Sequence, residues 1–165
     1  MADLWLDDGY EEVDLMTEGG DVGLIHDIRV DHIEYGVFYI PIQAGFFAEQ
    51  EMIERDLCRK LPPNTYEVKF ALRRDFEEGV PSYTQPADWE DLSTLTYRQS
   101  MALGRGIFQS TWMLRAHRDV RGFVLVSLVD RPKLSAYYGR LLNKYRDQVG
   151  FGVHSVLGGK GYVLV

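Results

Sequence analysis

Residues 122–129 form a short, almost entirely apolar run that lies between two segments of helical pattern. The run is Gly-Phe-Val-Leu-Val-Ser-Leu-Val, which has the length of a strand and is rich in valine. Such a run predicts a strand that is buried on both faces. Helical patterns are expected at about 106–117 before it and at 132–149 after it. A buried strand between two helices is typical of a layered α/β or α+β fold.

The segment 132–149 predicts the clearest helix of the chain. Its apolar residues recur at intervals of three and four, which places them on one continuous stripe. They are Leu134, Tyr137, Tyr138, Leu141, Leu142, Tyr145 and Val149. Gly150 suits the end of this helix. Two short strands, near 152–157 and 161–165, flank the turn at 158–160 and predict a hairpin.

The first half of the chain predicts three strands and one helix. Strands are expected at 23–30 and 34–42, and a helix at 46–61 that two prolines stop. Strict alternation of apolar and polar residues over 66–73 predicts a half-buried strand. Residues 76–87 predict a loop. The next segment is ambiguous, because Asp88 can cap a helix with Asp91 as its partner, whereas 93–97 has strand propensity.

These patterns together predict one domain with a mixed sheet of about six strands and about three helices. A chain of 165 residues with 45% apolar residues is large enough to bury a core. Its charge is sorted along the chain. Residues 1–63 carry fifteen acids and four bases, whereas residues 92–165 carry three acids and eleven bases, within a net charge of −7. We expect residues 1–21 to form an acidic peripheral segment and 92–165 to form a basic half.

Several classes of protein are not indicated. The first residues lack a basic segment followed by an apolar run, and no stretch is apolar for long enough to span a membrane. The single cysteine, Cys58, allows no internal disulfide and no multi-cysteine metal site. The four histidines have no third metal ligand at a recognisable spacing, so no metal is expected. We therefore expect a soluble, cytoplasmic protein without a metal.

Gly104-Arg105-Gly106, before the expected helix at 106–117, is a candidate anion site. Glycines let the backbone approach an anion, and the free amides of a helix N-terminus point toward it. Arg105 adds a charge-assisted contact. The alternative is a kink within one long helix from 89 to 118, with Arg105 in solvent.

Residues 91–165 resemble the C-terminal half of the Gcn5-related N-acetyltransferase superfamily. In that family a strand leads into an Arg/Gln-x-x-Gly-x-Gly/Ala loop, followed by helix, strand, helix and two strands. Met101-Ala-Leu-Gly104-Arg-Gly106 supplies both glycines, but Met101 stands where arginine or glutamine is usual, and Arg98 is out of register. Tyr137-Tyr138 resembles the tyrosine that, in this family, protonates the departing thiolate. Val149-Gly150-Phe151 resembles the Gly-Phe pair that often follows the helix carrying that tyrosine. The segment 91–95 is faintly similar to the autoinducer-synthase branch, which draws acyl groups from acyl carrier protein.

The resemblance implies a small acyltransferase that uses acyl-CoA or acyl carrier protein as co-substrate. Donor binding would fall to Gly104, Arg105, Gly106, Ile107 and Arg98. An amine would attack the thioester directly, with Tyr138 or Tyr137 as the acid and Glu90 or Asp91 as the base. Both tyrosines also lie on the apolar stripe of 132–149, so a purely structural role in the core is the alternative.

Nothing in the chain forces a catalytic function. The alternative is a non-catalytic protein-interaction protein, such as a bacterial immunity or antitoxin-like protein or a phage accessory or structural protein. Its acidic N-terminal half would meet a basic protein partner. Self-association of the acidic and basic halves is a further hypothesis, whereas nucleic acid is not favoured at a net charge of −7.

Residues 91–106 discriminate between the two functions. The acyltransferase needs a strand that ends in a loop at 103–106, with neighbouring strands parted to admit the donor. A continuous helix from 88 to 117 would remove that donor site.

Overall fold

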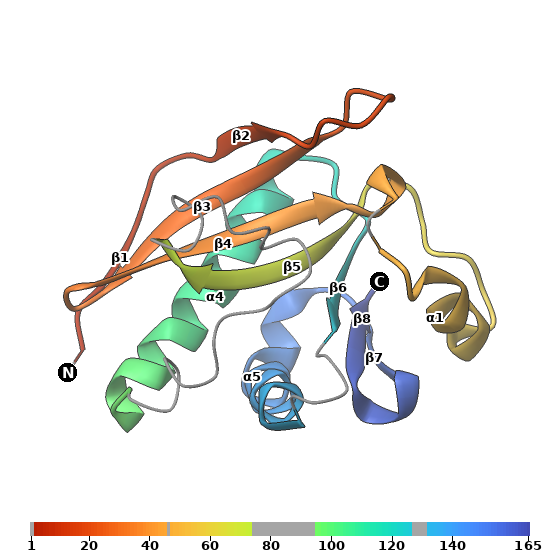
Figure 1. Ribbon diagram of the computed structural model, residues 1–165. Helices are drawn as coiled ribbons and strands as arrows, with labels where there is room; N and C mark the ends of the chain where they lie inside the picture. The colour runs from red at the N-terminus through yellow and green to blue at the C-terminus, as the bar shows by residue number, and fades with distance from the viewer. Residues whose placement is uncertain (1, 46, 74–94, 127–131) are drawn as a thin grey trace.

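The computed structural model describes residues 2–45, 47–73, 95–126 and 132–165, which form one mixed sheet with helices on both faces (Figure 1). The eight strands are β1 (Leu4–Leu6), β2 (Glu11–Asp14), β3 (Val22–Val30), β4 (Ile33–Pro41), β5 (Thr65–Leu72), β6 (Gly122–Val126), β7 (Val153–Val156) and β8 (Gly161–Leu164). The helices in the described ranges are α1 (Gln50–Leu57), α4 (Tyr97–His117) and α5 (Pro132–Val149), with single 3-10 turns at Ile42–Ala44 and Leu157–Gly159.

The strands follow the order β1-β3-β4-β5-β6-β8-β7, and β2 pairs with β3 beside β1. The pairing of β5 with β6 is parallel, and every other pairing is antiparallel. The predicted mixed sheet in an α/β or α+β fold is therefore confirmed. The sheet has eight strands rather than about six, because the acidic segment 1–21 adds β1 and β2 to the edge of β3.

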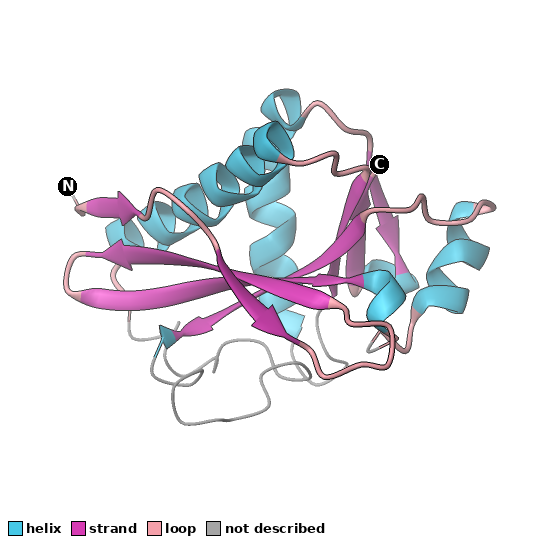
Figure 2. Ribbon diagram, turned by 90° about the horizontal axis from the view of Figure 1, so that it is seen from above, coloured by secondary structure: helices cyan, strands magenta, loops and turns pink. Residues whose placement is uncertain are grey.

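Helices α4 and α5 cover the same face of the sheet, and α1 covers the opposite face at the end formed by β6, β7 and β8 (Figures 1 and 2). The main core lies between the sheet and these two helices. It holds apolar side chains from β3, β4, β5 and β6 together with Leu103, Ile107 and Leu114 of α4 and Tyr138 and Leu141 of α5.

Helix α1 is shorter than the helix predicted at 46–61. It ends at Leu57 because Cys58 adopts a left-handed conformation with φ of 56°. The chain then turns back, and the Leu61 amide donates a hydrogen bond of 2.7 Å to Glu54 Oε2. The predictions at 66–73, at 132–149 and of the C-terminal hairpin are confirmed to within one residue at each end by β5, α5, β7 and β8.

Helix α4 begins at Tyr97, nine residues before the predicted start at about 106. Thr96 is its N-cap, and the Gln99 amide donates to Thr96 Oγ1 while the Gln99 side chain accepts from the Thr96 amide. This reciprocal pair is a capping box. The strand propensity of 93–97 is thereby overridden at Thr96 and Tyr97, and residues 93 and 94 lie outside the described ranges.

Candidate functional site

Of the two alternatives for 104–106, the structure has the long helix and not the Gly-rich turn, since these residues lie inside the continuous helix α4. Their backbone amides belong to the interior of the helix, where they bond to carbonyls four residues earlier and have nothing left for an anion. A Cβ on Gly104 would overlap Leu141 of α5, and a Cβ on Gly106 would lie 2.9 Å from Leu4 Cδ1. The two glycines therefore allow α4 to pack closely on α5 and on β1. The geometric premise of an anion loop at these positions is wrong.

The five residues predicted to bind the acyl donor lie on different sides of α4. Gly104 and Ile107 line an internal cavity between α4, α5 and the sheet, and Gly106 packs on Leu4 and Ile28. Arg98 and Arg105 instead line a hollow beside the first turns of the helix. The structure brings the two arginines together and separates them from the other three.

Strands β5 and β6 part from each other after a short pairing. They pair only through Thr65↔Gly122, Tyr66↔Phe123 and Glu67↔Val124, although β5 continues to Leu72. The parted region lies under α4 and α5. An apolar cavity of about 30 Å³ occupies it, lined by Val68 and Leu125 from the two strands and by Tyr138 from α5, among others. A cavity of this size holds a water molecule or two, so any larger ligand must push its walls apart.

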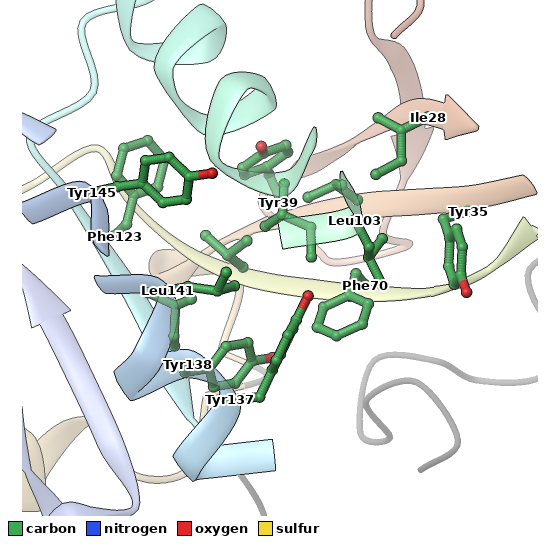
Figure 3. Packing of buried hydrophobic residues seen from close by; sticks show 14 of the residues in the cluster. Ile28, Tyr35, Tyr39, Phe70, Leu103, Phe123, Tyr137, Tyr138, Leu141 and Tyr145 are labelled. Carbon is green, nitrogen blue, oxygen red and sulfur yellow. The ribbon is translucent and has the colours of Figure 1, made fainter. Parts of the chain in front are cut away.

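Tyr137 and Tyr138 both extend from α5 toward Phe70 on β5 (Figure 3), and their hydroxyl groups differ. Tyr137 Oη donates a hydrogen bond of 3.0 Å to the Ser100 carbonyl of α4. Tyr138 is 1% exposed, and its hydroxyl has no hydrogen-bond partner within the described part of the chain. Burial raises the pKa of both phenols, so both stay protonated at neutral pH. The Tyr137 hydroxyl is therefore engaged in a hydrogen bond between the two helices. The Tyr138 hydroxyl, by contrast, can donate its proton to a ligand.

Glu67 is a buried acid at the point where β5 and β6 part. It is 6% exposed and forms an ion pair of 3.0 Å with Lys69 of the same strand. Burial raises the pKa of Glu67, and Lys69 opposes that rise. The negative charge of Glu67 in turn adds to the rise in the pKa of Tyr138. An acid and a phenol thus interact electrostatically at the parted strands.

Sequence reasoning missed Glu67. The alternation over 66–73 places it on the polar face of a half-buried strand, where an acid is ordinarily solvated. In the structure both faces of β5 are buried at this position, since Glu67 is 6% exposed and Val68, which points to the other face, is 2% exposed. The bases predicted instead, Glu90 and Asp91, lie outside the described residues.

A second buried polar cluster joins α4 to the sheet through His26 of β3. His26 Nε2 lies 2.7 Å from the Asp7 carbonyl, which only accepts, so Nε2 donates in this cluster. In the neutral ring His26 Nδ1 then accepts from Ser110 Oγ, at 2.6 Å, and Ser110 Oγ accepts from the Tyr39 hydroxyl, also at 2.6 Å. His26 and Ser110 are fully buried. The cluster fastens α4 to β3 and β4, and no substrate can reach its hydroxyl group.

Several acids of the N-terminal segment are neutralised within the molecule. Arg73, directly after β5, forms ion pairs with Glu11 at 3.0 Å and with Asp27 of β3 at 3.3 Å, and Arg118 pairs with Glu12 at 3.6 Å. The sorted charge along the chain therefore serves partly to hold the acidic edge strands on the domain.

Comparisons with known protein families, with curated proteins and with solved structures find no match for this chain. Among the described residues, no three histidine, cysteine, aspartate or glutamate side chains gather in a way that would hold a metal ion. Within the same ranges every helix is too short or too polar to cross a lipid bilayer.

Proposed function

We propose that this protein is a small acyltransferase that binds the thioester arm of an acyl donor between β5 and β6 and passes the acyl group to an amine. One observation carries the proposal. The two strands part directly after Glu67, and Tyr138, a fully buried phenol with no hydrogen-bond partner among the described residues, lines the apolar cavity between them. A buried hydroxyl without a partner costs about 1–3 kcal/mol, a cost that a folded protein retains where the group serves a ligand or a reaction.

The reaction needs one base and one acid. The amine nitrogen attacks the thioester carbonyl, so that a C–N bond forms and the C–S bond breaks. Glu67 takes the proton that the amine loses, and a pKa above its ordinary value makes its carboxylate a better base at neutral pH. The departing thiolate takes the proton of the Tyr138 hydroxyl, and proton return from solvent restores the phenol. Tyr137 holds α5 on α4 through the Ser100 carbonyl.

The donor is an acyl-CoA or an acyl carrier protein, which share a phosphopantetheine arm. An apolar cavity suits the acyl and pantetheine portions of that arm. The cavity is small, so the proposal requires α4 and α5 to move away from the strands when the donor enters. The phosphate contacts cannot come from amides at 104–106, because these are bonded within α4.

The continuity of α4 through 104–106 favours a second candidate, a non-catalytic protein that acts through protein–protein contact. The parted strands would then be a packing feature, and the unpartnered Tyr138 hydroxyl would serve no reaction. Ligand binding separates the two candidates.

Thermal unfolding with acetyl-CoA and with a long-chain acyl-CoA tests occupancy of the cavity. At a ligand concentration of about 100 times Kd, binding to the folded state adds about 2.7 kcal/mol to its stability. Leu125→Phe fills the cavity and is expected to abolish the rise in Tm relative to the ligand-free variant. Leu157→Phe, in the separate apolar cluster on the other face, is the matched control and should keep the rise. No rise in Tm at millimolar ligand with the wild-type protein contradicts the proposed function.

A further inference from the structure

A hollow lies beside the first turns of α4, next to Ala2 near the N-terminus. Its volume is about 510 Å³, and it is lined by Ala2, Tyr97, Arg98, Met101, Ala102 and Arg105. Ala2 and Ala102 are buried and Met101 is half-buried, whereas the Tyr97 ring is 79% exposed. No carboxylate of the described residues forms an ion pair with Arg98 or Arg105. The hollow is therefore an apolar depression edged by two unpaired positive charges.

The loop between β2 and β3 has the opposite character. Met16 is 86% exposed, the highest value among the large exposed hydrophobic residues of the described chain. Asp14 and Glu18 are exposed beside it in sequence, and neither has a cationic partner in the described part of the chain. This acidic tip, residues 14–21, presents one apolar side chain among carboxylates.

The acidic tip is ordered by its own hydrogen bonds. Asp14 Oδ1 accepts from the Met16 amide at 2.8 Å, and Thr17 Oγ1 donates to Asp21 Oδ2 at 2.7 Å. Leu15 is 4% exposed and anchors the loop in the small core on the face opposite to α4. A preorganised loop loses little conformational entropy when it binds, which favours its use as a docking element.

The hollow and the acidic tip lie at opposite ends of the molecule, since the N-terminal end of α4 and the β2–β3 loop are far apart in both views (Figures 1 and 2). The tip of one molecule therefore cannot fill its own hollow. We propose that the hollow binds the acidic tip of a second copy of this chain, with Met16 on the apolar floor and the carboxylates of Asp14 and Glu18 beside Arg98 and Arg105.

The contact is heterologous, because each copy contributes two different surfaces. A heterologous contact leaves one free hollow and one free tip in every dimer, so it extends into open chains or closes into rings. Tyrosine, methionine and arginine are the residue types that are enriched at protein interfaces. Charge complementarity favours a copy of this chain as the occupant, because its residues 1–63 carry fifteen acids and four bases.

Light scattering coupled to size exclusion tests the proposal with the full chain. At low ionic strength the mean mass is expected to rise with concentration above that of the 19.0 kDa monomer, and to fall again in 0.5 M salt, which screens the ion pairs. Met16→Asn removes the apolar side chain and suits the left-handed φ of 58° at this position. It should weaken association about tenfold, the equivalent of one interface anchor. Met52→Gln, at another exposed methionine on α1, is the matched control and should leave association unchanged.

A mixing experiment tests the heterologous geometry itself. Met16→Asn keeps a working hollow, and the double variant Arg98→Glu/Arg105→Glu keeps a working tip. At a concentration where the wild type is largely associated and tenfold weaker binding leaves mainly monomer, each variant alone should be mainly monomeric, and an equimolar mixture should form mainly a 1:1 dimer. The circular dichroism melting curve of each variant should match that of the wild type, since Met16 and Arg98 are exposed and Arg105 is half-exposed.

Three results overturn the proposal. They are a wild-type protein that stays monomeric at millimolar concentration and low salt, association in either variant that is as strong as in the wild type, and a mixture of the two variants that associates no more than each variant alone.

Discussion

Gly104 in α4 lies against Leu141 in α5 with no room for a methyl group between them. The helix continues through this glycine, and the contact sets how closely the two helices approach over the parted strands. Alanine at this position gains up to about 1 kcal/mol of helix propensity over glycine. It must also displace Leu141, which is 7% exposed, and overpacking of this kind costs about 1–3 kcal/mol.

We therefore expect Gly104→Ala to lower the free energy of unfolding, by up to about 2 kcal/mol after the gain in propensity. Chemical denaturation monitored by circular dichroism measures the change. Gln109→Ala, on the exposed side of the same helix, is the control and should change stability by less than about 0.5 kcal/mol. A stabilised Gly104→Ala variant would show that α4 and α5 are not in close contact there.

The first turn of α4 depends on Thr96. Its hydroxyl accepts from the Gln99 amide at 3.1 Å, and the Gln99 side chain also donates to Asp31 Oδ2 at 3.0 Å in the turn between β3 and β4. Thr96→Ala is expected to cost about 1 kcal/mol, the usual value for a lost N-cap. Thr96→Ser keeps the capping oxygen and should cost much less. Equal losses for the two variants would mean that the cap does not hold the helix start.

The pH dependence of stability reports on Glu67. Its pKa is raised in the folded protein, so between the unfolded and the folded pKa the folded state binds more protons than the unfolded state. The contribution of Glu67 to stability is therefore greatest at low pH. It falls as pH rises from the ordinary glutamate pKa through the raised value, and it levels off above that.

Urea denaturation of the wild type and of Glu67→Gln over the acid-to-neutral range isolates this contribution, because the other titrating groups cancel in the difference. The stability of the wild type minus that of Glu67→Gln is expected to fall with rising pH. A difference that rises with pH would show that Lys69, rather than burial, determines the pKa of Glu67.

Much of the fold follows from local patterns in the sequence. The apolar run at 122–129, the alternation over 66–73 and the stripe over 132–149 each reflect burial of one element against the next. The structure has a strand or a helix at each, and residues 127–129 of the apolar run lie outside the described ranges. The N-terminal strands β1 and β2 were not predicted, because their acidic residues lack strand alternation. Their pairing depends on β3 and on ion pairs with Arg73 and Arg118, which are distant in sequence.

The site was harder to predict for two physical reasons. Glycine is equally compatible with a tight turn and with close packing of helices, and the sequence at 104–106 does not distinguish these. Thr96 with Gln99 three residues later matches the capping-box pattern, so the sequence does contain a signal for a helix that starts at Tyr97. The importance of Glu67 depends on where two strands part, which is a property of the sheet and not of any segment.

The pair Tyr137 and Tyr138 tests acyl transfer at the parted strands most directly. Stability and thiol release are to be measured together for Tyr138→Phe and Tyr137→Phe, with an acyl-CoA donor and amine acceptors. Tyr138→Phe removes a buried hydroxyl that has no partner in the described ranges, so it should raise stability by about 1 kcal/mol. Tyr137→Phe loses the bond to Ser100 and should lower stability by about as much. Tyr138→Phe also removes the general acid, so this variant should release thiol about 100-fold more slowly than the wild type. Tyr137→Phe should retain most of the wild-type rate of thiol release. A Tyr138→Phe variant that releases thiol at the wild-type rate, or that is less stable than the wild type, contradicts the role assigned to this hydroxyl.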